Sequence, residues 1–476
     1  MATLPEGIQL SKINPKFLHS NSTSHVWAFG AFAELIDNAY DPDVGASSLI
    51  IDMQKVGTMQ CLIIVDNGAG MDKEKLIKML SFGYCDKGIY NRRESYKPVG
   101  LYGNGFKSGS MRLGKDALVF SRCEKSACIG FLSQTYLEAI GADSVIVPIL
   151  EYSLPDLKRN KDRQCLNNLE AILQYSEFKS EASLKEELNS LKSSVTGTKI
   201  FIFNLNRLQS GVGELDFQSD RKDIRCPDPY MADTTNLDCR PLEDTPEYKR
   251  SLREYCSILY LRPRMKIIIR GHPVKSKYIS KMLYQTEDHQ YKPSWMGRND
   301  KPIKIKIGFS CATDCNENYG LMLYHKNRLM RAFERVGYQK QANERGVGVI
   351  GVVELDFITP THNKQDFDRN DHFNSIMSAL AGKLNAYWNS KKETQNNDVG
   401  KLPDWTWAQC SNCLMWRRLP PGTDGDSLPK HWFCHMNKDA QYNRCFEDEE
   451  PDAPADTPRR RRAINKRNKD RLSEVR

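Results

Sequence analysis

Four cysteines crowd into one short stretch of the sequence, and they restrict what that stretch can fold into. Their spacing is Cys410-x2-Cys413-x20-Cys434-x10-Cys445. The stretch is too short to bury a core of its own. Four soft thiolate ligands with one tight Cys-x-x-Cys pair are typical of a tetrahedral structural Zn²⁺ site. We therefore predict a zinc-held module, with no disulfides and with no coordination position open for catalysis.

Length and charge limit the rest of the chain. The 476 residues predict about three domains at roughly 150 residues each. No apolar run approaches the roughly 20 residues of a membrane span, so we do not expect a membrane protein. The net charge of +9 is compatible with an acidic partner such as nucleic acid. The first residues resemble neither a signal peptide nor a myristoylation site, which favours a cytosolic or nuclear protein.

Hydrophobic periodicity predicts two α/β units before the cysteine-rich stretch. For the first unit we expect a helix over 27–41, a polar region with helical pieces over 153–196, an irregular insertion over 206–246, and strands at 49–53, 61–65, 117–121, 145–149 and 199–203. For the second we expect a helix and a strand within 250–270, strands at 303–309, 319–324 and 347–357, and a helix over 371–388.

The helix expected over 27–41 carries the first group of candidate functional residues. Its apolar residues share one side, while Glu34, Asp37, Asn38 and Asp41 share the other. Glu34 and Asn38 lie one turn apart, where a carboxylate can take a proton from water and an amide oxygen can bind Mg²⁺. A merely solvated polar face is the alternative, and the helix alone does not decide between them.

The second group is Cys61-Leu-Ile-Ile-Val-Asp66-Asn67-Gly68-Ala69-Gly70-Met71, an apolar strand that ends in a carboxylate and two glycines. Glycine lets the backbone approach a planar ligand closely, and Asp66 can accept a hydrogen bond from an exocyclic amine such as that of adenine. Asp-Asn-Gly is also a common hairpin turn, and that alternative stays open here.

The third group is the glycine-rich stretch Gly100-Leu-Tyr-Gly103-Asn104-Gly105-Phe106-Lys107-Ser108-Gly109-Ser110. Glycines ahead of a helix present backbone N–H groups to phosphate oxygens, and Lys107 adds positive charge. The stretch matches neither the P-loop nor the dinucleotide fingerprint. A loop without a ligand is the alternative.

In this order and spacing, the three groups resemble the Bergerat fold of the GHKL ATPases. The resemblance implies an α/β (α+β) sandwich that holds ATP between a mixed sheet and helices. It assigns Glu34 as general base, Asn38 as Mg²⁺ ligand and Asp66 as adenine reader. The residues it places around ATP are Asn38, Asp66, Gly68, Gly70, Met71, Ser81, Lys87, Gly103, Asn104, Gly105, Phe106, Lys107, Ser108 and Thr198.

Within that superfamily the sequence resembles the MORC (microrchidia) ATPases, nearest to the shorter vertebrate members with one CW finger. The GHKL resemblance implies that Gly103–Ser108 forms a lid over the phosphates, here called the lid motif. The MORC resemblance rests on Phe17-Leu-His-Ser-Asn-Ser-Thr-Ser-His25, Met79-Leu-Ser-Phe-Gly83, the stretch from Gly103 to Asp116, Tyr324-His-Lys-Asn-Arg-Leu329 and Thr361-His-Asn-Lys-Gln-Asp-Phe367. It implies that the second α/β unit is an S5-type transducer whose Lys364 reaches the γ-phosphate. An ordinary surface lysine is the alternative.

The cysteine-rich stretch also holds Trp405, Trp407, Trp416 and Trp432, and exposed tryptophan faces attract a desolvated cation. Trp-x-x-Cys-x-x-Cys-x-x-Trp-Arg-x-Leu-Pro…Trp-x-Cys resembles a CW finger. The resemblance implies that Trp407 and Trp416 form a cage for trimethyl-lysine, with the histone H3 tail trimethylated at lysine 4 as the ligand. Trp432 is expected near the zinc. Glu447 and Glu450 are candidate peptide contacts, although a solvated acidic run is equally compatible.

Together these features predict a nuclear, Mg²⁺-dependent ATPase that dimerises on ATP binding, reads histone H3 and contacts DNA, with ATP, Mg²⁺ and Zn²⁺ as cofactors. The alternative is a histone-reading chromatin scaffold that binds ATP with little turnover. We expect a GHKL ATPase domain over 1–285, an S5-like transducer over 286–390, a linker over 391–403, a CW finger over 404–452 and a basic disordered tail over 453–476.

Overall fold

The computed structural model describes residues 12–84, 99–100, 103–191, 195–227, 245–311, 318–341, 343–391, 403–420, 423, 427–429, 431–447 and 449–450. The chain divides into two compact units, which are described separately. Within the described residues, every helix is too short or too polar to cross a membrane. Most of the expected linker and all of the expected tail lie outside the described residues.

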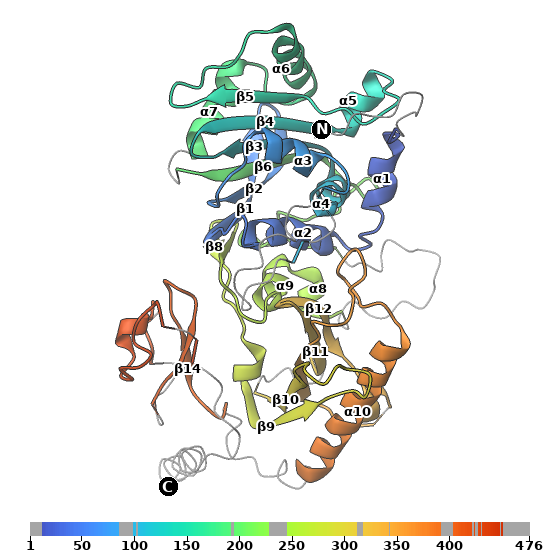
Figure 1. Cartoon of the computed structure of the whole chain (residues 1–476), viewed down its shortest axis with the longest axis vertical. Coiled ribbons are helices and arrows are strands. Elements are labelled where there is room, and N and C mark those ends of the chain that lie inside the picture. Colours follow the sequence, from blue (N-terminus) through green and yellow to red (C-terminus); the bar gives the residue numbers. More distant parts are fainter. Residues whose placement is uncertain are drawn as a thin grey trace. The chain divides into compact units, whose positions relative to one another are not determined.

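The first unit is built on an eight-stranded sheet with the order β5-β4-β3-β6-β2-β1-β7-β8 (Figure 1). Every neighbouring pair from β5 to β1 is antiparallel. The strands are β1 Ser48–Val56, β2 Met59–Asp66, β3 Gly114–Arg122, β4 Ser126–Ser133, β5 Ile149–Ser153, β6 Gly197–Leu205, β7 Lys266–Ile269 and β8 His272–Pro273.

Helices cover both faces of this sheet, so the unit is an α/β sandwich. Its helices are α1 Lys16–Ser22, α2 Ala28–Tyr40, α3 Lys73–Leu80, α4 Gly105–Leu113, α5 Gln134–Ala139, α6 Arg163–Tyr175 and α7 Glu181–Ser190. On one face, Ile172 of α6 and Leu184 of α7 pack in one cluster with Phe120 and Phe201 of the sheet. Because side chains alternate along a strand, Val119 points to the opposite face from its neighbours Leu118 and Phe120, which belong to that cluster. Helices α2 and α4 lie on this second face (Figure 1).

For this unit one strand prediction is wrong, and one strand of the main ladder is absent from the predictions. The strand expected at 145–149 begins only at Ile149; Pro148, which has no N–H to donate to a ladder, directly precedes it. Strand β4 was not predicted, because Gly130 weakens its pattern. A Cβ at Gly130 would press on the side chains of Leu76 and Leu80 of α3, so the glycine makes room for that helix.

The second unit contains a five-stranded sheet with the order β12-β11-β13-β10-β9. Its strands are β9 Leu283–Tyr291, β10 Ile303–Ser310, β11 Gly320–His325, β12 Arg328–Glu334 and β13 Val349–Glu354. Helix α10, Asp371–Lys391, buries Phe373, Ile376 and Leu380 against the sheet in one core cluster. The short helices α8, Glu247–Arg250, and α9, Leu252–Ile258, precede it in the chain.

Local sequence explains the β11–β12 hairpin, which was not predicted. The two residues between the strands, Lys326 and Asn327, both have positive φ (46° and 74°). That geometry is a type I′ turn, whose twist suits a hairpin. The Asn327 side chain adds a bond, because its Oδ1 accepts from the Arg262 N–H at 2.6 Å.

The cysteine-rich stretch forms a small two-stranded sheet within the second unit. Strands β14, Trp407–Gln409, and β15, Trp416–Arg418, pair antiparallel. A short 3-10 helix, η6, spans Cys434–Met436, and two others, η4 Ile279–Lys281 and η5 Gly337–Lys340, lie earlier in the unit. The finger docks onto β9, because the Asp404 carboxylate accepts from the backbone N–H groups of Gln285 and Thr286, both at 2.9 Å.

Candidate functional site

Glu34 lies on α2 at the point where α2 meets the N-terminal end of α4. Its side chain is buried, with 4% exposed. Two glycines one turn apart on α4 permit the contact: a Cβ at Gly105 would overlap Glu34 Oε2, and one at Gly109 would lie 2.9 Å from the Ala31 carbonyl oxygen. A carboxylate at a helix N-terminus is stabilised by the helix dipole and the free N–H groups. The sequence therefore holds a buried carboxylate at the start of the lid helix.

The polar side of α2 is not a solvated face. Asp37 and Asp41 are fully buried, like Glu34, and Asn38 is half-buried. The periodicity correctly separated apolar from polar residues, but it did not reveal that both sides are covered. The alternative of a solvated polar face is thereby excluded.

Asp66 ends β2 and faces β6 directly across the ladder, opposite Thr198. Its Oδ1 accepts from the Gly68 N–H at 2.8 Å. Burial raises the pKa of Asp66 to about 6, and hydrogen bonds from the backbones of Gly68 and Thr198 oppose that rise. The hairpin alternative for this motif is excluded, since β2 pairs with β1 and β6 and the chain continues into α3.

The glycines after Asp66 are required by close packing. A Cβ at Gly68 would overlap the side chain of Val44. Gly70 has φ +67°, and its Cβ would overlap the carbonyl of Arg122 at the end of β3. At both positions the backbone packs so closely against its neighbours that only glycine fits.

Ser121 is not among the predicted residues, yet it contacts two of them, Met71 and Thr198. Its Oγ accepts from the Met71 N–H at 2.8 Å and lies 3.1 Å from Thr198 Oγ1. Thr198 in turn lies beside Asp66 in the ladder. A serine inside a strand carries no motif, so only the register of β3 against β6 identifies it.

Several predicted lid residues gather around the start of α4. Asn104 is the N-cap residue, and its Oδ1 accepts from the Gly83 N–H at 3.2 Å. Phe106 and Ser108 are buried, and Ser108 Oγ lies 3.1 Å from His25 Nε2. The described residues thus bring the lid motif against α2 and α1. Lys87 lies outside the described residues.

Lys107 and Ser81, both predicted to contact ATP, lie at the junction of α3 and α4. The Lys107 ammonium donates to the carbonyls of Met79 at 2.8 Å, and of Ser81 and Gly103 at 2.5 Å each. The side chain is 1% exposed, and burial lowers the pKa of Lys107 to about 8. Ser81 Oγ donates to the carbonyl of Ile77 on α3 at 2.7 Å.

Asp41, at the C-terminal end of α2, holds the other side of the glycine-rich stretch. Its two carboxylate oxygens accept from the N–H groups of Val99 at 2.7 Å and Gly100 at 3.0 Å. The sequence placed Asp41 on the polar face but assigned it no role. The same helix thus carries the candidate base and an anchor for the glycine-rich stretch.

Lys364 belongs to the second unit and is no ordinary surface lysine. It is 5% exposed and adopts a left-handed conformation, with φ 49°. Its N–H donates to the Thr361 carbonyl at 2.9 Å, and Thr361 Oγ1 donates to Asn363 Oδ1 at 2.8 Å. These bonds fold residues 361–366 into a tight turn. The γ-phosphate contact of Lys364 stays a prediction.

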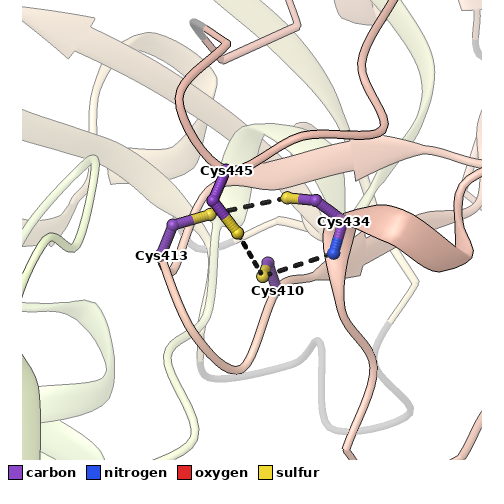
Figure 2. A group of neighbouring side chains, drawn as sticks. All are labelled: Cys410, Cys413, Cys434 and Cys445. Atoms are coloured by element: carbon purple, nitrogen blue, oxygen red, sulfur yellow. Dashed lines mark hydrogen bonds between the residues drawn. The ribbon is translucent and has the colours of Figure 1, made fainter. Parts of the chain in front are cut away.

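The four cysteines of the finger converge as the spacing predicts (Figure 2). All four Sγ atoms lie within 4.8 Å of one another, with 3.5 Å between Cys413 and Cys434 and 3.8 Å between Cys410 and Cys445. Zn–S bonds of about 2.3 Å in a tetrahedron place sulfurs roughly 3.8 Å apart, whereas a disulfide needs about 2.05 Å. The cluster therefore fits zinc and excludes disulfides among these four.

The shell around the cysteines suits thiolates. Cys410 Sγ accepts from the backbone N–H groups of Asn412 and Cys434, each at 3.4 Å, and Cys434 Sγ accepts from Arg417 Nε at 3.4 Å. N–H donors and a buried guanidinium stabilise negative sulfur. Trp432, 5% exposed, packs in the same cluster, as predicted from its place beside the zinc ligands.

The two predicted cage tryptophans face the 3-10 helix η4 of the same unit. Lys281 Nζ lies 3.7 Å from the ring centroid of Trp407, and the Tyr278 ring contacts Trp416 edge-on at 6.1 Å. Lys281 also pairs with Glu449 at 3.2 Å and is 6% exposed. Trp407 therefore lies against an ammonium group of its own chain.

The acidic residues after the last cysteine differ from one another. Glu450 is 3% exposed, accepts from the Arg418 N–H at 3.0 Å and pairs with its guanidinium at 2.6 Å. That carboxylate closes the finger onto β15. Glu447 offers its carbonyl to Arg417 Nη2 at 2.8 Å. Peptide contacts by Glu447 and Glu450 stay predictions.

Comparison with known proteins finds three domains in the order of the motifs. The family described as "Histidine kinase-, DNA gyrase B-, and HSP90-like ATPase" matches residues 26–162. "Morc6 ribosomal protein S5 domain 2-like" matches 250–388, and "CW-type Zinc Finger" matches 406–451.

Individual relatives agree with these matches. Mouse MORC family CW-type zinc finger protein 3 is 47% identical over 94% of this chain and 48% of its own length. Protein MICRORCHIDIA 7 of Arabidopsis thaliana is 37% identical over 83% of this chain and 58% of its own. The chain thus spans about half the length of these relatives. With a GHKL ATPase domain, an S5-like domain and a CW finger in this order, the chain belongs to the MORC family.

Proposed function

We propose that this chain is a nuclear, Mg²⁺-dependent ATP hydrolase that dimerises on binding ATP and associates with chromatin through its CW finger. The observation that carries the hydrolase is the burial of Glu34 against the N-terminal end of α4 at Gly105. A buried carboxylate there lies where free N–H groups favour anions, so a base and a phosphate site adjoin each other.

Each residue has a role that suits its place. Glu34 orients and deprotonates the attacking water, and its neighbour Asn38 binds Mg²⁺ through its amide oxygen. Asp66 accepts from the adenine amine, while Thr198 and Ser121 hold that part of the site through their 3.1 Å contact. The N–H groups at the start of α4 bind the phosphates.

Phosphate release by wild type and by Glu34→Ala tests the hydrolase. We expect ATP-dependent release that falls at least about a hundredfold in the variant, as for loss of a general base. Equal, near-zero rates together with intact ATP binding would instead favour a histone-reading scaffold with little turnover.

ATP-dependent dimerisation is proposed for the surface formed by α1 and the junction before α2. Val26 is 85% exposed and Phe17 44% exposed, although both are large apolar residues. The junction is tied to the lid helix, because Arg112 of α4 donates to the carbonyls of His25 at 2.6 Å and Val26 at 3.2 Å. Light scattering with a non-hydrolysable ATP analogue should show a dimer. A chain that stays monomeric at saturating analogue would contradict it.

The finger is proposed to read the histone H3 tail trimethylated at lysine 4. Trp407 already lies against an ammonium, that of Lys281 at 3.7 Å, which supports a cation as its ligand. A methylated peptide has to displace Lys281 from this ring. Titration of trimethylated against unmethylated H3 peptide tests the assignment, and equal affinities would contradict it.

The proposal also includes DNA binding. It rests on the net charge of +9 and on the basic residues Arg459–462, Lys466 and Arg467, which lie outside the described residues. Phosphate contacts release counterions, so affinity should fall steeply with salt. Affinity that is flat between 50 and 200 mM salt, the range over which such contacts lose about 10³-fold or more, would exclude them.

A further inference from the structure

We propose that Lys107, the cation of the glycine-rich lid motif, is a positioning residue that fastens the base of the lid and does not itself bind phosphate. The geometry of the clasp is independent of any ligand. Its consequence for phosphate binding rests on the nucleotide site proposed above.

All three donors of the Lys107 ammonium are used inside the protein. They reach the carbonyl oxygens of Met79 at 2.8 Å, Ser81 at 2.5 Å and Gly103 at 2.5 Å. An ammonium has three N–H groups and no more, so no donor is left for a phosphate oxygen. The Phe82 ring, 5.2 Å away, covers the group, and the whole side chain is 1% exposed.

The three carbonyls belong to two elements that the lysine joins. Met79 lies in the last turn of α3 and Ser81 is its C-cap, where carbonyls lack partners within the helix and attract a cation. Gly103 lies two residues before α4 begins, in a left-handed conformation with φ +65°. The ammonium therefore ties the end of α3 to the start of α4. The bond from the Gly83 N–H to Asn104 Oδ1, 3.2 Å, reinforces the same junction.

Fastening this junction fixes the direction of the first N–H groups of α4. Those N–H groups are the phosphate donors of the proposed site, and they act only if the helix start is held in place. The other side of the glycine-rich stretch is held by the Asp41 carboxylate at Val99 and Gly100. Lys107 is thus the second of two charged side chains that hold the glycine-rich stretch. The phosphates of the nucleotide are attracted by the partial positive charge of the first N–H groups of α4.

Three variants of the full chain separate a clasp from a phosphate ligand. Lys107→Met keeps the apolar stem and removes the ammonium. Lys107→Arg keeps the charge, but a planar guanidinium cannot place three donors as an ammonium does. Lys115→Met, at an exposed lysine of β3, is the matched control.

Hydrogen exchange of the nucleotide-free protein gives the first readout. We expect amides within 79–84 and 103–108 to exchange at least about tenfold faster in both Lys107 variants and unchanged in Lys115→Met. Calorimetry gives the second: both Lys107 variants should lose ATP affinity together, without rescue by arginine. Exchange like wild type in Lys107→Met, or ATP affinity like wild type in Lys107→Arg, would overturn the proposal.

A measurement on wild type covers the case in which the variants do not fold. Acylation followed by mass spectrometry should label Lys115 readily and Lys107 hardly at all, both with and without ATP. Ready labelling of Lys107 that ATP then blocks would identify a phosphate ligand and overturn the clasp. If wild type takes up no nucleotide, the proposed function fails, while exchange and labelling still decide whether the clasp exists.

Discussion

Adding one methyl group at Gly105 should impair hydrolysis while leaving the fold intact. In Gly105→Ala the new Cβ would lie closer than 3.0 Å to Glu34 Oε2, a distance that Cβ atoms essentially never adopt. The clash is with the far end of a flexible side chain, so the carboxylate gives way and the helix stays. A base displaced by about 1 Å costs on the order of a hundredfold in rate. Because Gly105 is the first residue of α4, the penalty for glycine inside a helix does not apply there, and the substitution should change the free energy of unfolding little.

Gly109→Ala is the matched control on the same helix. Its Cβ would lie 2.9 Å from the Ala31 carbonyl oxygen, which is backbone and cannot swing aside. We therefore expect Gly109→Ala to lower the melting temperature, and Gly105→Ala to lower kcat at an unchanged melting temperature. Phosphate-release kinetics and thermal unfolding, run side by side, measure both. Wild-type kcat in Gly105→Ala would refute the placement of Glu34 as the base.

Three further predictions concern other parts of the chain. Removal of zinc with a chelator, or the substitution Cys413→Ser, should unfold the finger and abolish peptide binding, while ATP binding persists. The measurement is Trp fluorescence during titration with peptide, which should then no longer change. ATP affinity should fall up to tenfold per pH unit below about 6, because protonated Asp66 is no longer a charged acceptor; pH-independent calorimetry between pH 5 and 7 would contradict this. Lys281→Ala should tighten trimethyl-lysine peptide binding by about three- to thirtyfold, the equivalent of roughly 0.7–2 kcal/mol of lost cation–π competition, whereas Lys277→Ala should not.

Local chemistry made some features predictable from the sequence. The Cys-x-x-Cys pair and the two later cysteines predict a zinc site from ligand type and spacing alone. Their Sγ atoms converge as expected. Helix α2 and the apolar central strands β1, β2, β3, β6, β10, β11 and β13 follow from the sequence pattern, whereas the more polar strands β9 and β12 do not. The order of the three nucleotide motifs indicated the GHKL superfamily, and further stretches such as Thr361–Phe367 indicated the MORC family within it.

Other features depend on contacts between segments distant in sequence. Nothing in the sequence indicates that Ser121 contacts Thr198, because that contact arises from the register of β3 against β6. Likewise a lysine in a glycine-rich motif suggests phosphate, but only the fold shows that Lys107 points to the end of α3. Gly130 weakens the strand pattern of β4, and only the packing of helix α3 against it explains why a glycine is there.

Titration of Mg²⁺–ATP into the zinc-loaded chain, with Asp66→Asn and Glu34→Ala beside wild type, decides whether Asp66 and Glu34 belong to one ATP site. We expect wild type and Glu34→Ala to bind ATP with similar affinity and only wild type to release phosphate. Asp66→Asn should bind ATP at least about tenfold more weakly, because it lacks a charged acceptor. Heat of binding absent from wild type, or undiminished in Asp66→Asn, would contradict it.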